Sequence, residues 1–149
     1  MEREKELSNK ESNSVESAPD KLSGLKVLVV EDNLLNLEIV TEVLRERGLI
    51  VTAAENGQIA VKLFQDNPPG TFDVILMDMH MPIMGGLEAT KTIRTMERTD
   101  AQTIPILALT ANDFEEDIRQ TREAGMNDHL TKPFDMEKIL EAIVTYTGK

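Results

Sequence analysis

Short apolar runs recur along the chain, and amphipathic stretches separate them. The runs cover residues 25–30, 49–54, 72–78 and 104–109, and a short fifth strand is expected at residues 127–131. A nearly continuous apolar run of this length is typical of a strand that is buried on both faces. The stretches between the runs place apolar residues three and four positions apart, which is the spacing of one helix face. The pattern therefore predicts about five repeats of a strand followed by a helix.

Capping and turn residues mark the ends of the predicted helices. Asn33 and Asp135 precede the first and the last helix as N-caps, while Gly48 and Gly125 follow the first and the fourth. The helix faces expected to be buried consist of aliphatic and aromatic residues at helical spacing: Leu34, Leu37, Ile39, Val40, Val43 and Leu44 in the first helix, Ile59, Ala60, Leu63 and Phe64 in the second, and Met136, Ile139, Leu140, Ile143 and Val144 in the last.

Alternating strands and helices with short connections predict a parallel sheet with helices on both faces and right-handed crossovers. This α/β domain is expected to span residues 25–149, and the 149-residue chain is long enough to bury one core. Residues 1–24 are rich in Glu, Lys and Ser and contain few apolar residues. Such a segment buries too little surface to offset its ordering entropy, so it is predicted to be a disordered lead or an interdomain linker.

Charge and composition exclude several classes of partner. A formal net charge of -11 argues against binding of nucleic acid or of an anionic membrane by this chain alone. The chain has no cysteine, which excludes disulfides and thiolate metal sites. No apolar run is long enough to cross a membrane, and the N-terminus is too charged for a signal peptide. A cytoplasmic location is the expectation.

Polar residues occur where each of four predicted strands ends. They are Glu31, Asp32, Asp78, Thr110 and Lys132. In a parallel sheet all strands point the same way, so their carboxyl ends share one edge, where open α/β sheets place their binding sites. These residues are therefore expected to be neighbours in space.

Three converging carboxylates without cysteine describe a site for a hard cation such as Mg²⁺ or Mn²⁺. An ammonium and a hydroxyl beside them would stabilise the oxygens of a phosphoryl group in transfer. Asp78 is then the natural acceptor, because carboxylates form acyl phosphates. The chain has no glycine-rich loop that could hold ATP, so the phosphoryl group is expected to come from another molecule.

The motifs around these residues resemble the receiver domain of two-component response regulators. Glu31-Asp32, Asp78 within DMHMP, Thr110 within LTAN and Lys132-Pro133 within LTKPF occur in the order of that family, from about residue 25 to the C-terminus. The resemblance implies a flavodoxin-like, doubly wound (βα)5 fold with the parallel strand order 2-1-3-4-5.

The resemblance also implies roles for the acidic residues. Asp78 would take a phosphoryl group from a phosphohistidine. Asp32 would bind Mg²⁺ directly and Glu31 through water, and the backbone carbonyl of His80 would complete the protein ligands with Asp78. The domain would thus catalyse its own phosphorylation and dephosphorylation.

A second set of implied roles concerns the phosphoryl group and the response to it. Lys132, the Thr110 hydroxyl and the Ala111 N–H would bind the phosphate. Thr110 and His129 would act as switch residues. The resemblance places His80 and Asn112 where the family tunes the lifetime of the phosphoryl group, and each of the two stands two residues beyond a motif residue.

The chain departs from the family pattern at a few positions. Glu31 replaces one residue of the commoner Asp pair, and His129 is less aromatic than the usual Tyr or Phe at the switch position. Gly85 stands where an Asp often precedes the helix. No departure removes a group that the chemistry requires.

The sequences of these motifs most resemble those in the receivers of hybrid sensor histidine kinases. The partners of such receivers are a histidine phosphotransfer protein or the dimerisation domain of the kinase. In that case the parent chain would be a kinase, and this domain its cytoplasmic portion. An exposed patch of Leu34, Leu35 and Pro133 is expected to meet the phosphodonor. A stand-alone single-domain response regulator is the alternative.

Two rival classes remain on the same fold. A Mg²⁺-dependent aspartyl-phosphate phosphatase of the haloacid dehalogenase type requires a second Asp two residues after its nucleophile. This chain has His80 at that position. A nucleotide- or flavin-binding module requires a loop after the first strand that binds phosphate. Here that position carries Glu31 and Asp32, which would repel phosphate in the absence of a metal.

Overall fold

A computed structural model describes residues 22–110 and 115–147 of the chain. Five parallel strands form one sheet in the order β2-β1-β3-β4-β5, which confirms the predicted fold. The strands are β1 (Lys26–Val30), β2 (Ile50–Ala54), β3 (Val74–Asp78), β4 (Ile106–Thr110) and β5 (Asp128–Thr131). The helices are α3 (Leu34–Glu46), α4 (Gly57–Asp66), α5 (Gly86–Arg94), α6 (Glu115–Ala124) and α7 (Met136–Thr147).

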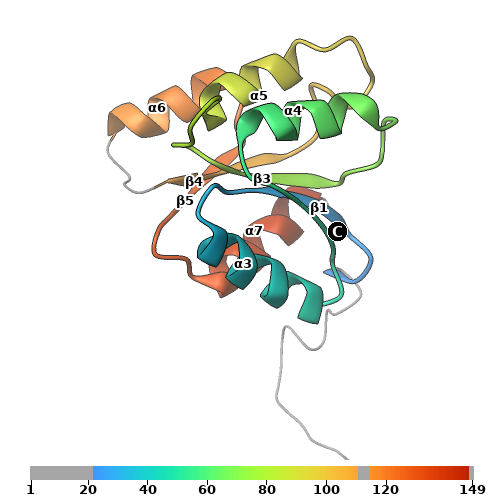
Figure 1. Ribbon diagram of the computed structural model, residues 1–149, viewed down its shortest axis with the longest axis vertical. Helices are drawn as coiled ribbons and strands as arrows, with labels where there is room; N and C mark the ends of the chain where they lie inside the picture. Colours follow the sequence, from blue (N-terminus) through green and yellow to red (C-terminus); the bar gives the residue numbers. More distant parts are fainter. Residues whose placement is uncertain (1–21, 111–114, 148–149) are drawn as a thin grey trace, which may run out of the picture.

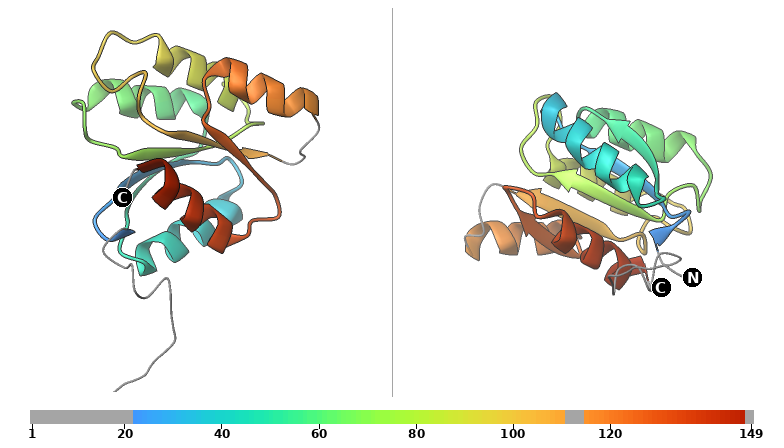
Figure 2. Two further views of the ribbon diagram at one scale, coloured as in Figure 1. Left: turned by 180° about the vertical axis from the view of Figure 1, so that it is seen from behind. Right: turned by 90° about the horizontal axis from the view of Figure 1, so that it is seen from below.

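The helices form two layers, one on each face of the sheet. Helices α3 and α7 cover one face, and α4, α5 and α6 cover the other (Figures 1 and 2). Because neighbouring side chains of a strand point to opposite faces, Val27 and Val29 enter the core under α3 and α7, whereas Leu28 and Val30 enter the other core. Strands β3 and β4 are buried along their whole length, as expected for interior strands of a parallel sheet.

Asparagine caps start the two helices that follow β1 and β2. The side chain of Asn33 accepts the N–H of Asn36 at 3.0 Å, and that of Asn56 accepts the N–H of Ile59 at 2.9 Å. Each cap satisfies an amide that has no partner inside its helix. The helix after β3, α5, has Gly85 as its N-cap residue, which provides no side-chain cap.

The predicted buried faces are only partly correct. Leu37, Val40 and Leu44 are buried in α3, but Leu34 and Ile39 are 64% and 44% exposed. The buried stripe of α3 is therefore narrower than its apolar spacing predicts. Ile59 on α4 is likewise exposed. Ala60 and Phe64 on α4 and Ile139, Leu140 and Ile143 on α7 are buried as predicted.

Arg94, at the end of α5, forms hydrogen bonds to the segments before β4 and before β5, at the end of the sheet opposite the strand C-termini. Its guanidinium and Nε donate to the carbonyls of Ala101 and Gly125 and to the side-chain oxygen of Asn127, at 2.9 to 3.0 Å. The same Asn127 oxygen accepts the N–H of Ile106 at 2.9 Å. These bonds fix the starts of β4 and β5, and with them the register that aligns the strand ends.

Candidate functional site

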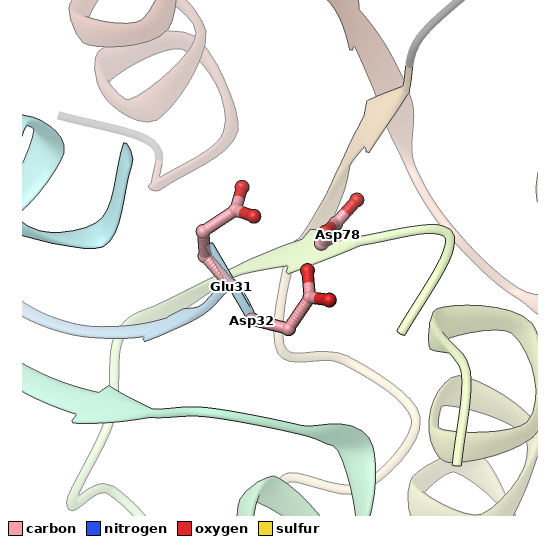
Figure 3. A group of neighbouring side chains, drawn as sticks. All are labelled: Glu31, Asp32 and Asp78. Carbon is pink, nitrogen blue, oxygen red and sulfur yellow. The ribbon is translucent and has the colours of Figure 1, made fainter. Parts of the chain in front are cut away.

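The carboxylates of Glu31, Asp32 and Asp78 converge at one edge of the sheet. Asp78 is the last residue of β3, and Glu31 and Asp32 directly follow β1. These strands are paired side by side, with Val30 opposite Met77, so their ends meet. One oxygen from each carboxylate lies within 4.8 Å of the others (Figure 3). Glu31 and Asp78 are buried, whereas Asp32 is exposed.

Lys132 brings a positive charge to two of these carboxylates. Its Nζ atom lies 3.2 Å from Glu31 Oε1 and 3.3 Å from Asp78 Oδ1. The backbone sets this position, because the N–H of Lys132 donates to the carbonyl of Thr110 at 2.7 Å, at the end of the β4–β5 pair. The structure thus brings together four of the predicted site residues, and places the buried Thr110 at the adjacent strand end.

The two oxygens of Glu31 have different surroundings. Oε2 accepts the backbone N–H of Asn33 at 3.1 Å. Oε1 is buried and, among the described residues, meets no donor at hydrogen-bonding angles, so its contact with Lys132 is an ion pair and not a directed hydrogen bond. The sequence did not predict the hydrogen bond from the backbone N–H of Asn33 to Glu31, because a backbone donor cannot be recognised from the type of residue.

Burial and the charge of Glu31 raise the pKa of Asp78 from 3.8 to about 7, although Lys132 acts in the opposite direction. Burial lowers the pKa of Lys132, but the charges of Asp78 and Glu31 outweigh it and raise that pKa. The carboxylates therefore repel each other, and the single ammonium does not fully offset this repulsion. An additional cation at the site would do so.

Glycines allow the loop after β3 to fold back on the site. A Cβ at Gly86 would lie 2.2 Å from the backbone oxygen of Asp78, and a Cβ at Gly57 would lie 2.5 Å from that of Met84. The N–H of Gly57 donates to the same Met84 oxygen at 3.0 Å. The N–H of His80 donates to Asp78 Oδ1 at 3.4 Å. The loop is thereby held between β3 and the start of α4.

The remaining predicted residues have separate positions. His80 is exposed in the loop after β3. His129 lies in β5, next to Ala108 of β4, and its side chain is 27% exposed. Ala111 and Asn112 lie outside the described residues.

The residues present fit a divalent cation. A Mg²⁺ ion with ligands at about 2.1 Å joins oxygens about 3 to 4 Å apart, close to the spacing of the three carboxylates. Among the described residues, the buried Glu31 Oε1 lacks a directed donor. Burial and the charge of Glu31 raise the pKa of Asp78, and a bound cation would favour its ionised form. Oxygen-only ligands suit a hard ion.

The fold and the site together define a flavodoxin-like α/β protein with an acidic site at the topological switch point of its sheet. The model of the response regulator receiver domain matches residues 27–144, and the chain belongs to this family. The strand order, the acidic pair after β1 and the lysine after β5 agree with the resemblance seen in the sequence.

Curated relatives include a hybrid histidine kinase and a sensor protein. The chain is 37% identical over 140 residues to hybrid signal transduction histidine kinase I of Dictyostelium discoideum, covering 93% of this chain and 8% of that protein. It is 39% identical over 124 residues to sensor protein GacS of Pseudomonas syringae pv. syringae, covering 83% of this chain and 13% of that protein. The chain thus spans about a tenth of the length of these relatives.

Solved structures show the same fold. The receiver domain of sensor histidine kinase PA1611 from Pseudomonas aeruginosa, with a magnesium ion coordinated in its active site cleft, is 35% identical with a TM-score of 0.76, covering 85% of this chain and all of that one. The Saccharomyces cerevisiae receiver domain of Ssk1, in complex with the histidine phosphotransfer protein Ypd1, belongs to a structure with 33% identity and a TM-score of 0.77, covering 85% and 90%. Among the described residues, no helix is long and apolar enough to span a membrane.

Proposed function

We propose that this receiver accepts a phosphoryl group on Asp78 from a phosphohistidine of a partner protein, with Mg²⁺ or Mn²⁺ bound by Glu31, Asp32, Asp78 and the carbonyl of His80. The observation that carries the proposal is the position of Lys132, whose ammonium lies 3.3 Å from a buried strand-end carboxylate that is itself part of an acidic cluster. That arrangement offers a nucleophile and a counter-charge to the same incoming group.

In the proposed step, an oxygen of ionised Asp78 attacks the phosphorus and forms the P–O bond of an acyl phosphate. The P–N bond breaks, and its electron pair remains on the imidazole nitrogen of the donor. Lys132 Nζ then binds a phosphoryl oxygen while it remains at the strand edge. A bound divalent cation would supply positive charge for the phosphoryl oxygens and would favour the ionised form of Asp78.

The buried Thr110 at the end of β4 and the N–H of Ala111 are proposed to bind the phosphoryl oxygens beside Lys132. Movement of the Thr110 hydroxyl toward the phosphate would alter the surroundings of β5, because Thr110 lies opposite Thr131 of that strand. His129, two residues before Thr131, is the proposed second switch residue. His80 and Asn112 are proposed to tune the lifetime of the acyl phosphate.

The proposed partners are a histidine phosphotransfer protein and the dimerisation domain of a histidine kinase. Support comes from the exposed apolar residues Leu34 and Leu35 at the start of α3, which are 64% and 65% exposed. Pro133, also exposed, follows Lys132. These residues directly follow the functional segments after β1 and β5, where a donor histidine would approach. The parent chain would then be a hybrid kinase, with a stand-alone regulator as the alternative.

The test is the intact mass of the protein after incubation with Mg²⁺ and acetyl phosphate, beside the Asp78→Asn variant. The wild type is expected to gain one phosphoryl group and the variant none. Asp73→Asn, which alters an aspartate outside the cluster, is the control and is expected to gain the group. Uptake by Asp78→Asn would place the acceptor elsewhere. A wild type that gains nothing either from acetyl phosphate or from a phosphorylated histidine phosphotransfer protein would refute the proposal.

A further inference from the structure

Strand β2 forms one edge of the sheet, and its outward-facing backbone groups can be identified. Ile50 donates its N–H to Leu25, and Ala54 accepts the N–H of Glu31, so the backbone groups of residues 50, 52 and 54 turn toward β1. Because a strand alternates, Val51 and Ala53 turn their N–H and C=O groups to the free edge. In the described part of the chain, one group reaches this edge: Arg45 Nη2 donates to the Val51 carbonyl at 3.3 Å.

A groove of about 690 Å³ runs beside this edge, between β2 and α3. Apolar side chains line part of it, with Ala53 on the strand and Leu34 and Leu37 on the helix. The side chain of Ala53 therefore faces the groove while its backbone groups face the free edge. A strand added at this edge would place alternate side chains in the groove.

The helix wall of the groove is acidic. Glu38, Glu42 and Glu46 stand four residues apart along α3 and are all exposed. Among the described residues that line the groove, the one cation is Arg45, which already contacts the Val51 carbonyl. Three carboxylates against one engaged guanidinium leave the groove with negative charge. Its complement is a positively charged chain.

We infer that the β2 edge and the α3–β2 groove bind an extended basic segment of a partner protein, which pairs with Val51 and Ala53 as a sixth strand. Alternate apolar side chains of that segment enter the groove beside Ala53, and its Lys or Arg side chains lie along Glu38 and Glu42. The groove shares Leu34 with the apolar residues proposed to meet the phosphodonor, but Glu38, Glu42 and the β2 edge lie outside that patch and outside the acidic cluster. Strand pairing at this edge therefore does not depend on phosphorylation.

The charge of the groove also argues against other occupants. Two copies of this chain paired at β2 would bring two rows of glutamates together, which costs free energy. Nucleic acid would meet the same repulsion. Arg45 partly opposes the addition of a strand at this edge, because the added strand must replace the contact of Arg45 with the Val51 carbonyl.

The probe is a synthetic peptide of alternating Lys and Val with blocked ends, added to the ¹⁵N-labelled protein and followed by amide chemical shifts. Saturable shifts are expected at Val51 and Ala53 at peptide concentrations up to about 1 mM. A peptide of alternating Glu and Val is the charge control and is expected to leave both amides unchanged. Sedimentation of the protein without peptide tests self-association.

Variants separate the edge from the groove. Ala53→Pro removes an outward N–H without breaking a bond to β1, and is expected to abolish binding. Glu38→Lys with Glu42→Lys is expected to weaken binding about tenfold, and Arg45→Ala to strengthen it. Should Ala53→Pro fail to fold, the wild type and a peptide N-methylated on its pairing face test the same bonds.

The inference is overturned if Val51 and Ala53 do not respond to the basic peptide, or if shifts centre on Asp78 and Asp32 instead. Equal binding of the acidic peptide, or full binding by the glutamate variant, would overturn it as well. Concentration-dependent dimers with shifts at β2 would assign the edge to a second copy. None of these readouts requires phosphorylation of Asp78, so the outcome is independent of the proposed function.

Discussion

At the scale of single residues, the site is dominated by one buried carboxyl. Asp78 is 3% exposed, and burial together with Glu31 raises its pKa to about 7. A carboxyl whose pKa is higher in the folded than in the unfolded state binds more protons when folded, so folding stability falls as pH rises between those two values. Without a divalent cation, the ionised Asp78 therefore destabilises the fold near neutral pH.

This predicts that Asp78→Asn stabilises the metal-free protein at pH 8 but much less at pH 5. The penalty that the variant removes is at most about 4 kcal/mol, so the melting temperature should rise by several degrees at pH 8. Thermal unfolding in EDTA at both pH values measures it. Addition of Mg²⁺ should raise the wild-type melting temperature more at pH 8 than at pH 5. An equal effect of the substitution at both pH values would contradict the high pKa of Asp78.

At the scale of elements, the N-termini of the helices fix the positions of the loops that contain the site residues. Asn33 caps α3 through its side chain, while its backbone N–H binds Glu31. Asn56 caps α4 in the same way, far from any carboxylate of the cluster in the chain. The two caps are therefore a matched pair, of which one adjoins the site.

Asn33→Ala and Asn56→Ala are each expected to lower the free energy of unfolding by about 1 kcal/mol, because each leaves a helix amide without its partner. Urea denaturation measures the loss. Gln58→Ala, an exposed substitution in the first turn of α4, is the control and is expected to change stability by less than about 0.5 kcal/mol. Since Ala retains the backbone N–H at position 33, Mg²⁺ affinity should persist in Asn33→Ala. A large drop in that affinity would show that the side chain itself supports the site.

At the scale of the whole molecule, the strand ends connect Asp78, the proposed acceptor, to β5 at the far edge of the sheet. Thr110 of β4 is buried next to Thr131 of β5, and its carbonyl accepts the N–H of Lys132. Phosphorylation would add about -1.5 to -2 charges at Asp78 and draw the Thr110 hydroxyl and Lys132 toward it. The response would therefore pass from β3 through β4 to β5.

Thr110→Ala is thus expected to accept the phosphoryl group at Asp78 and yet to show a weaker structural response. Intact mass reports uptake, and amide chemical shifts of α6 and β5 report the response. Thr92→Ala, a substitution on α5 away from the strand ends, serves as the control and should respond as the wild type does. Shift changes of full size in phosphorylated Thr110→Ala would refute a switch role for its hydroxyl.

Recognition of the donor also belongs to this scale, because it combines α3 with the loop after β5. Replacement of Leu34 and Leu35 by Ser is expected to slow phosphoryl transfer from a histidine phosphotransfer protein at least tenfold, since two exposed apolar contacts are lost. Uptake from acetyl phosphate should not change. Ile50→Ser alters a residue of similar exposure at the opposite end of the strands and should leave both rates intact. Equal slowing with both donors would point to damage of the site itself.

The sequence by itself determined the alternation of strands and helices, because each buried run and each helix face repeats with its own period. It also determined the candidate site, since Asp78, Thr110 and Lys132 stand at strand ends that any parallel sheet must align. The order of the strands came from family resemblance, because local periodicity contains no information about which strands are neighbours.

The tertiary structure decided what depends on packing between distant segments. It showed which side of α3 is covered, and so left Leu34 and Ile39 exposed where their spacing alone predicted burial. It placed Lys132 beside Glu31 and Asp78. It buried Asp78 next to Glu31, which raises the pKa of Asp78 although Lys132 acts in the opposite direction. It also left β2 at an edge beside an acidic groove. Distances, burial and free edges arise only when the chain is folded, because they are properties of pairs of segments and not of any one stretch of sequence.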